Sequence, residues 1–170
     1  MGRGEREAFE SLIRQYQGRV VNFIARYLGD RYAAEDLAQE AFLRVYRAAP
    51  RFEPKTRVST WIFRIAYNLI LTEIKHRKRR ENLCEALSRG GEDGSEPFAD
   101  ASERYELEEE IESAMGKLAA NQRAALLLRV NEGLTYQEIG EILGTSVGSV
   151  ESLLFRARRN VRRSLGREKK

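Results

Sequence analysis

The 170 residues are enough for one domain of ordinary size or for two small ones, and a hydrophobic content of 42% is sufficient for compact cores. No apolar run approaches the roughly 20 residues that cross a bilayer, and the first residues lack the apolar segment of a secretory signal, so we expect a cytoplasmic protein without membrane insertion. One cysteine, Cys84, and one histidine, His76, are too few for an internal disulfide or a structural zinc site, so we expect no metal and no cofactor.

The formal net charge of +4 is distributed unevenly along the chain. Basic residues predominate in residues 1–80 and again in 121–170, whereas acidic residues predominate in 81–120. Two basic modules joined by an acidic segment are suited to two contacts along one polyanion. The distribution therefore favours a protein that binds nucleic acid.

Apolar residues recur at spacings of three and four almost throughout the chain, which predicts an all-α protein. The expected helices cover residues 5–28, 31–49, 59–81, 103–119, 121–131, 136–143 and 147–165. Between the third and the fourth helix, Gly, Ser, Pro and acidic residues replace the periodic apolar ones, which is typical of a flexible linker over 82–103. The sequence thus predicts two small helical domains, 1–81 and 104–170, joined by that acidic linker.

The helix expected over 31–49 has an unusual outer face. A helical projection gives it an apolar stripe for the core, but it also places Leu43 near the centre of the opposite, charged side. A single exposed leucine is ordinary, so a plain solvated surface is one explanation. An apolar centre with a charged rim is also how protein interfaces are built. We therefore hypothesise that this side binds a partner protein through Asp36, Gln39, Glu40, Leu43 and Arg44.

The helix expected over 59–81 has two distinct faces. Its buried side is expected to comprise Ile62, Phe63, Ala66, Leu69, Ile70 and Ile74. The other side suits nucleic acid, because Arg and Lys neutralise phosphates, Asn hydrogen-bonds an adenine edge and an indole ring stacks on an unpaired base. That side carries Trp61, Arg64, Asn68, Thr72, Lys75 and Arg79. Packing at the core edge is an alternative explanation for Trp61, and the helix macrodipole is an alternative explanation for the basic residues at the helix end.

The C-terminal segment has the pattern of a helix-turn-helix. Thr135 and Glu138 form a capping box that opens a short helix, and Gly144 ends it. Ser146 is positioned to cap the next helix, and the small Gly140 allows the two helices to cross closely. A purely structural helical hairpin would show the same pattern.

The second helix of a helix-turn-helix reads the major groove of DNA. Its outward residues here are Ser149, Glu151, Ser152, Phe155, Arg156 and Arg159. Arginine pairs bidentately with guanine, and an exposed aromatic ring contacts a thymine methyl group. We therefore expect this face to read duplex DNA.

Together these stretches resemble the sigma-70 family of bacterial RNA polymerase initiation factors, and within it the extracytoplasmic-function (ECF) group, which keeps only conserved regions two and four. For region two the resemblance rests on AEDLAQEAFLRVY at 34–46 and STWIFRIAYNL at 59–69. For region four it rests on LTYQEIGEILG at 134–144 and on the residues that follow it, 147–150 and 154–158. The resemblance covers nearly the whole chain.

The resemblance implies an ECF-type sigma factor, which is not an enzyme but binds core RNA polymerase and directs promoter-specific transcription initiation. The face around Leu43 would bind the clamp helices of the β′ subunit, and region four would also contact the β flap. Region four would read the minus-thirty-five element, and a separate anti-sigma factor is expected as regulator. Recognition and melting of the minus-ten element would involve Lys55, Thr56, Arg57, Ser59, Trp61, Arg64, Asn68, Lys75 and Arg79.

Two other functions are compatible with parts of this pattern. A dimeric helix-turn-helix regulator would bind operator duplex unaided, but it has no use for a basic third helix that carries a tryptophan. A helical nuclease would need clustered carboxylates for a metal or a nucleophile with its base, and the acids of 103–112 lie on a solvated helix without histidine. The DNA sequence read by region four cannot be carried over, because Glu151 and Leu153 stand where the group often has basic residues.

Overall fold

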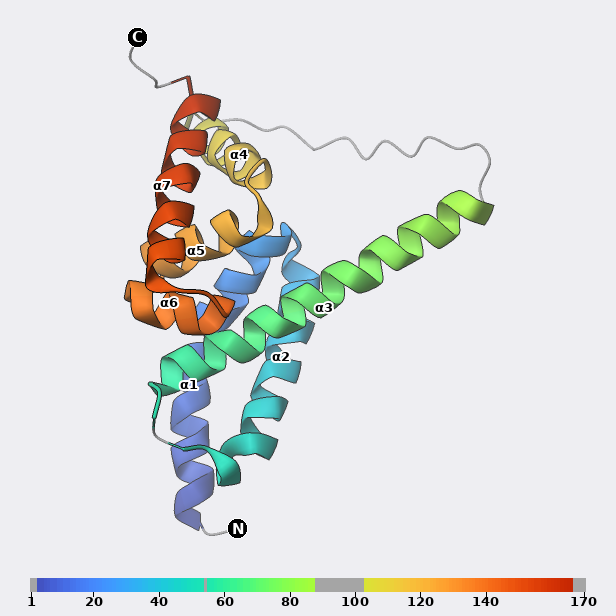
Figure 1. Cartoon of the computed structure of the whole chain (residues 1–170). Coiled ribbons are helices and arrows are strands. Elements are labelled where there is room, and N and C mark those ends of the chain that lie inside the picture. Colours follow the sequence, from blue (N-terminus) through green and yellow to red (C-terminus); the bar gives the residue numbers. More distant parts are fainter. Residues whose placement is uncertain (1–2, 54, 88–102, 167–170) are drawn as a thin grey trace.

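The computed structural model describes residues 3–53, 55–87 and 103–166. Over these residues the chain is entirely helical, which confirms the all-α prediction, and none of the described helices is long and apolar enough to cross a membrane. The elements are α1 (Arg3–Leu28), α2 (Arg31–Ala48), the 3-10 turn η1 (Ala49–Arg51), α3 (Val58–Leu87), α4 (Glu103–Gly116), α5 (Ala120–Val130), α6 (Tyr136–Leu143) and α7 (Val147–Ser164) (Figure 1).

Helices α1, α2 and α3 form the first packed unit. The chain reverses between α1 and α2 at Gly29, whose φ of +69° suits a residue without a side chain, and the carboxylate of Asp30 then caps α2 by accepting from the Ala33 N–H at 3.0 Å. Aliphatic and aromatic side chains from all three helices fill the core. Those with less than 1% exposure are Val20, Phe23, Ile24, Ala34, Ala41, Val45, Ile62, Phe63, Ala66 and Ile70.

Helix α3 is longer than expected, and its outer half projects away from the other helices (Figure 1). It continues past residue 81 to Leu87 because the residues there are good helix formers and the first glycines come only at 90 and 91. Ile74 was expected in the core, but 36% of it is exposed, since α3 leaves the packed unit at this point. Residues 88–102 of the expected linker lie outside the described residues, so the linker and the domain boundaries stay predictions.

Helices α4 to α7 form the second unit, and α6 and α7 make the expected helix-turn-helix. The capping box at Thr135 and Glu138 is present, and Gly144 ends α6 in the left-handed region with φ +67°. Gly140 lies so close to the turn that a Cβ built on it would be 2.7 Å from the carbonyl oxygen of Thr145. Three buried side chains hold α7 against the unit, namely Val150, Leu154 and Ala157.

The two units pack against each other, which the sequence did not indicate. Helix α5 lies on α1 and helix α6 lies on α3, so one cluster of buried apolar residues runs through both units. Polar side chains join the units as well: the Tyr67 hydroxyl donates to Asn121 Oδ1 at 2.9 Å and the Tyr27 hydroxyl to the Ala120 carbonyl at 3.2 Å. Burial raises the pKa of Tyr67 to about 12, so both phenols are neutral donors.

Candidate nucleic-acid and partner interfaces

The outer face of α2 presents an exposed leucine within a rim of polar side chains. Leu43 has 50% of its surface exposed, and beside it Arg44 Nε lies 2.7 Å from Glu40 Oε1. Gln39 and Asp36 are exposed one and two turns before Leu43, respectively. The structure therefore brings the five expected partner-binding residues to one side of α2, and their binding role stays a prediction.

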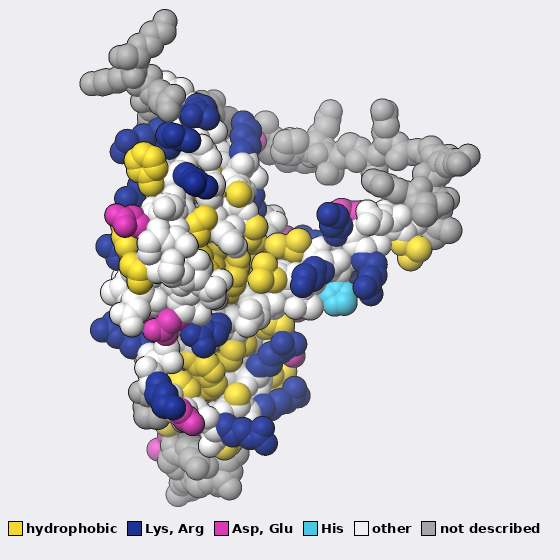
Figure 2. All heavy atoms as spheres, in the orientation of Figure 1, with side chains coloured by type: hydrophobic (Ala, Val, Ile, Leu, Met, Phe, Trp, Pro, Cys, Tyr) yellow, Lys and Arg dark blue, Asp and Glu magenta, His cyan; other side chains and the backbone are white. Residues whose placement is uncertain are grey.

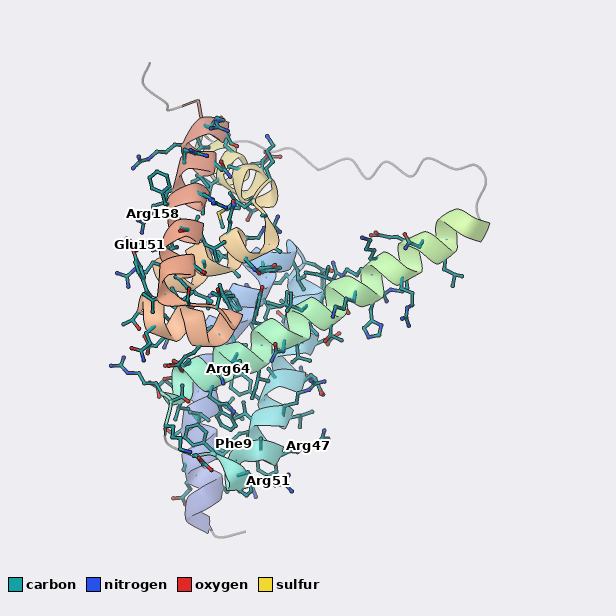
Figure 3. The ribbon with its side chains drawn as sticks, viewed as in Figure 1. Phe9, Arg47, Arg51, Arg64, Glu151 and Arg158 are labelled. Atoms are coloured by element: carbon teal, nitrogen blue, oxygen red, sulfur yellow. The ribbon has the colours of Figure 1, made fainter. Side chains whose placement is uncertain are left out.

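A groove of about 950 Å³ between α1 and α2 adjoins this face. Gln39 and Leu43 line it from α2, and Phe9 and Ile13 line it from α1. Figure 3 shows Phe9 near the outer end of the two helices, where its ring lies 4.9 Å from that of Tyr46. Nothing in the sequence marked the α1 wall of this groove. Phe9 and Ile13 lie on an apolar stripe of α1, and such a stripe has the same pattern whether it is buried in the core or lines an open groove.

The start of α3 and the loop before it hold most of the residues expected to read DNA. Trp61 is half-buried, and its ring lies 4.6 Å from the ring of Phe52, so the structure supports the core-edge explanation for its position. Lys55 is exposed and pairs with Glu53, and Asn68 is exposed on α3. Trp61 and Asn68, seven residues apart, thus lie on the same side of α3, although Trp61 is partly packed.

Two of the expected DNA-reading arginines contact the second unit. Arg64 Nε donates to the Glu141 carbonyl at 3.1 Å, and Figure 3 shows this side chain at the boundary between α3 and α6. Arg57 Nη1 lies 3.4 Å from Glu138 Oε1. No signal in the sequence marked these pairs, because each joins residues at least 77 positions apart.

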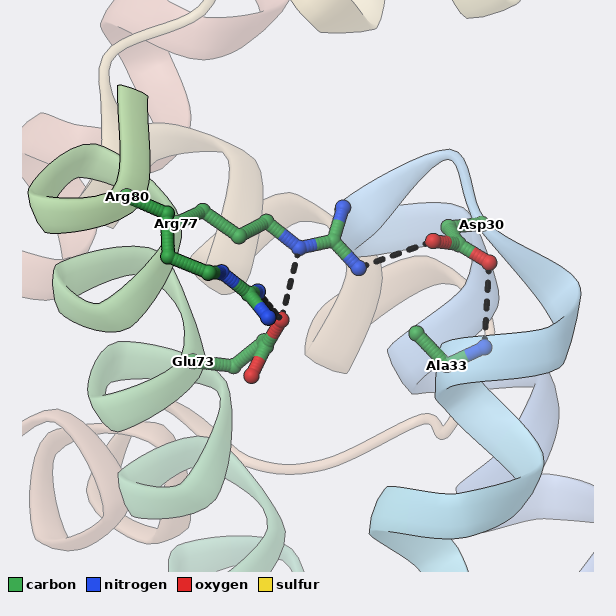
Figure 4. A network of polar contacts seen from close by, with 5 residues as sticks. All are labelled: Asp30, Ala33, Glu73, Arg77 and Arg80. Atoms are coloured by element: carbon green, nitrogen blue, oxygen red, sulfur yellow. Dashed lines mark hydrogen bonds and ion pairs between the residues drawn. The ribbon is translucent and has the colours of Figure 1, made fainter. Parts of the chain in front are cut away.

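The basic run at residues 75–80 divides into structural and exposed members. Arg77 donates to Glu73 Oε1 and to Asp30 Oδ2, both at 2.8 Å, and Arg80 reaches the same Glu73 oxygen at 3.2 Å (Figure 4). The hydrogen bond from the Ala33 N–H and the charge of Arg77 lower the pKa of Asp30. Arg77 therefore ties α3 to the N-terminus of α2.

The remaining basic side chains of this run are free for a ligand. Lys75, His76, Lys78 and Arg79 are exposed, and Figure 2 shows basic side chains gathered on the projecting half of α3. Lys75 and Arg79 are thus placed as expected for phosphate contacts, whereas the run as a whole is not one binding surface.

The outward face of α7 is open to solvent. All six expected residues on it are exposed, and Phe155 has 64% of its surface exposed. Figure 3 shows Glu151 and Arg158 pointing away from the rest of the molecule, and Figure 2 shows further basic side chains over α7. The Ser149 hydroxyl lies 2.9 Å from the hydroxyl of Ser146, the N-cap residue, so it serves the start of the helix.

The described residues contain no group of three or more His, Cys, Asp or Glu side chains that could hold a metal ion. Cys84 is exposed on the projecting end of α3. The surfaces described above present exposed arginines, aromatic rings and one leucine-centred face, which are groups suited to binding.

Comparison with known proteins relates both units to one family. Residues 12–80 match the family model of sigma-70 region 2, and residues 108–161 match that of sigma-70 region 4. The RNA polymerase sigma-H factor of Pseudomonas aeruginosa is 34% identical over 96% of this chain and 89% of its own. The ECF RNA polymerase sigma factor SigW of Bacillus subtilis is 33% identical over 96% of this chain and 91% of its own.

A solved structure has the same fold. The sigma factor RpoE of Bartonella quintana, crystallised in complex with the anti-sigma factor NepR, matches with a TM-score of 0.77 at 20% identity, over 96% of this chain and 99% of the other. The likeness in fold therefore extends over both helical units.

Proposed function

The chain belongs to the sigma-70 family of RNA polymerase initiation factors, in its ECF group, and from this premise we propose which surface makes each contact. Such a factor is not an enzyme: it binds core RNA polymerase and directs initiation to particular promoters. The matched segments, 12–80 and 108–161, fall within the two domains expected at 1–81 and 104–170. We place its action in the cytoplasm, with the polymerase.

The outer face of α2 binds the clamp helices of the polymerase β′ subunit. The observation that supports this assignment is the half-exposed Leu43 within a rim of Asp36, Gln39, Glu40 and Arg44. An apolar centre with a charged rim excludes water from the leucine while the rim sets the orientation of the partner. The β flap is the second polymerase contact, and it is made by the second unit.

The first unit reads the minus-ten element from the loop and face that begin at Lys55 and continue along α3. Extrusion of a base from the duplex costs a few kcal/mol, so side chains that capture the extruded base can start melting without ATP. Asn68 supplies a hydrogen-bonding amide for such a base, and Trp61 supplies a ring at the edge of the core. The nine residues proposed for this contact are Lys55, Thr56, Arg57, Ser59, Trp61, Arg64, Asn68, Lys75 and Arg79.

The minus-thirty-five element is read as duplex by α7. Exposed Arg156 is proposed to read a guanine edge, and exposed Phe155 to contact a thymine methyl group. Glu151 points outward and accepts from a cytosine amino group in this arrangement. The other proposed contacts are Ser149, Ser152 and Arg159, and the open face of α7 is the observation that best supports the function as a whole.

An anti-sigma factor is the expected regulator. The sigma factor from Bartonella quintana that has the same fold was crystallised with its anti-sigma factor. In this chain, the groove between α1 and α2 offers an apolar surface for such a partner. Because this groove adjoins Leu43, a partner seated in it would compete with the polymerase clamp.

Reconstituted transcription tests the proposed function. The purified chain is added to core RNA polymerase with a library of genomic fragments, and the starts of the transcripts are sequenced. We expect starts that share an upstream element of two parts, and none when the chain is omitted. Failure to stimulate transcription, together with tight unaided binding to duplex DNA, would instead identify a dimeric regulator.

A further inference from the structure

The outer half of α3 extends beyond the packing that holds its first half (Figure 1). Ile70 is the last described residue of α3 that is fully buried, and Ile74, one turn later, is already exposed. Lys75 and Arg79, which are proposed to contact promoter DNA, lie beyond this point and are exposed. Burial of apolar side chains therefore does not fix the direction in which α3 holds these two cations.

A cluster of charged side chains joins α3 to α2 just beyond Ile74 (Figure 4). Arg77 Nη2 donates to Asp30 Oδ2, and Arg77 Nε donates to Glu73 Oε1, both at 2.8 Å. Among the described residues, the contact between Arg77 and Asp30 is the hydrogen bond farthest along α3 that joins this helix to another element. The two side chains are 31% and 37% exposed, so salt screens the pair only in part.

Two anions on different helices hold the Arg77 guanidinium. Asp30 stands at the start of α2, where it is the N-cap residue. Glu73 lies one turn before Arg77 on α3, and it also accepts from Arg80 at 3.2 Å. The hydrogen bonds to Glu73 and to Asp30 raise the pKa of Arg77. Arg77 is thus engaged within the fold, and it is not presented to a ligand as its exposed neighbours are.

A small tilt of α3 displaces its outer side chains by the length of one base-pair step. Arg79 lies nine residues beyond Ile70, which corresponds to about 14 Å of helix. A tilt of about 15° over that length moves Arg79 by about 3.5 Å, and successive base pairs are about 3.4 Å apart. The direction of α3 relative to α2 therefore decides which phosphate Arg79 reaches.

We propose that Arg77 is a positioning residue that sets the length of the spacer between the two promoter elements. It holds the projecting half of α3 in one direction relative to α2, so DNA bound along α3 runs toward α7 on one course. A spacer changed by one base pair shifts the minus-thirty-five element by about 3.4 Å and about 35°, which takes it out of register with α7. The proposal rests on the functions proposed above for α2, α3 and α7.

Asp30→Asn and Arg77→Gln break the contact from its two sides. Asparagine is as good an N-cap as aspartate, so Asp30→Asn keeps the hydrogen bond from the Ala33 N–H through its amide oxygen. Its amide nitrogen then faces Arg77, and two donors form no hydrogen bond. Arg14→Gln is the matched control, because it removes one positive charge and an exposed ion pair with Glu10 on α1. Circular dichroism checks that every variant is folded at the assay temperature.

Reconstituted transcription from one mapped promoter is the main measurement, with the natural spacer and with spacers one base pair shorter and longer. The ratio of transcription from the natural spacer to that from the altered spacers cancels any uniform loss of folded protein. We expect Asp30→Asn, Arg77→Gln and the double variant to lower this ratio equally, by at least about threefold, because a partly exposed contact is worth little more than a surface ion pair. Arg14→Gln should keep the ratio of the unaltered chain.

The direction of α3 is also measurable on the free chain. Cys84, the single cysteine, is exposed on the projecting half of α3, and Arg47→Cys supplies a second labelling site near the end of α2. Pulsed electron–electron resonance between spin labels at these positions should give a narrow distribution of distances. Asp30→Asn or Arg77→Gln in this background should broaden it, and an equally broad distribution without either change would overturn the fixed direction.

The outcomes separate this inference from the proposed function. An unchanged ratio in the variants overturns the proposal, and so does the absence of a spacer preference in the unaltered chain. A ratio that falls with Arg77→Gln but not with Asp30→Asn also overturns it, because that pattern identifies Arg77 as a direct DNA contact. All three results leave promoter-specific transcription intact, whereas a lack of promoter-specific starts with the unaltered chain contradicts the proposed function itself.

Discussion

Replacement of Leu43 by aspartate should weaken binding to core RNA polymerase by at least about 30-fold while the fold remains intact. A fully buried leucine side chain contributes about 1.5–3 kcal/mol, and half of Leu43 is exposed in the free chain, so its burial by the clamp is worth about 1 kcal/mol. A carboxylate left without a partner in the interface costs about 1–3 kcal/mol more. The total of about 2–4 kcal/mol corresponds to binding that is weaker by roughly 30-fold or more.

The assay is titration of labelled chain with purified core polymerase. Leu83→Asp is the matched control, because Leu83 is also an exposed leucine on a helix but lies on the projecting end of α3, away from the α2 face. Both variants should unfold in urea within about 0.5 kcal/mol of the unaltered chain, as exposed substitutions usually do. Normal polymerase binding by a folded Leu43→Asp variant would refute the interface.

Three further changes test other parts of the molecule. Arg156→Ala should weaken binding to the minus-thirty-five duplex by about 1–3 kcal/mol in an anisotropy titration, and an unchanged promoter preference would show that another face of α7 reads the bases. Gly140→Ala should lower the free energy of unfolding in urea by about 1–3 kcal/mol, because its Cβ would lie 2.7 Å from the Thr145 carbonyl oxygen; an unchanged midpoint would mean that the turn relaxes easily. The pKa of Asp30 is lowered in the fold by a backbone N–H of α2 and by Arg77, so its stabilisation is present above about pH 4 and is lost as the pH falls through that lowered value. Asp30→Asn should therefore flatten the dependence of the urea midpoint on pH between about 2 and 5, and an equally steep dependence in the variant would assign the acid sensitivity to other carboxylates.

The sequence was sufficient for the elements whose causes are local. The limits of α6 followed from the capping box at Thr135 and from Gly144, and the exposed position of Phe155 followed from its place opposite Val150 and Ala157 on one helix. The exposed Leu43 was also visible, since a helical projection depends only on neighbours within a few turns. The family resemblance drew on these same local stretches, and the comparisons confirmed it.

Ile74 and Tyr67 show where local patterns were insufficient. Ile74 fits the core stripe of α3, yet it is exposed because the other helices of the unit end before it. Tyr67 is 3% exposed because α5 from the second unit covers it, and its hydroxyl finds Asn121 there. Periodicity reports which side of a helix is apolar, but it does not report how far the neighbouring helix extends along it.

The sequence by itself determined the succession of helices, the caps at Thr135 and Ser146, the exposed outer face of α7 and the membership of the sigma-70 family. Only the tertiary structure decided that α6 lies on α3, that Arg57 and Arg64 face Glu138 and Glu141, and that Arg77 supports the N-terminus of α2. The physical reason is that helix formation depends on neighbours within one or two turns. These contacts join residues 47 to 81 positions apart, and no periodic pattern in the sequence indicates which distant residues will meet.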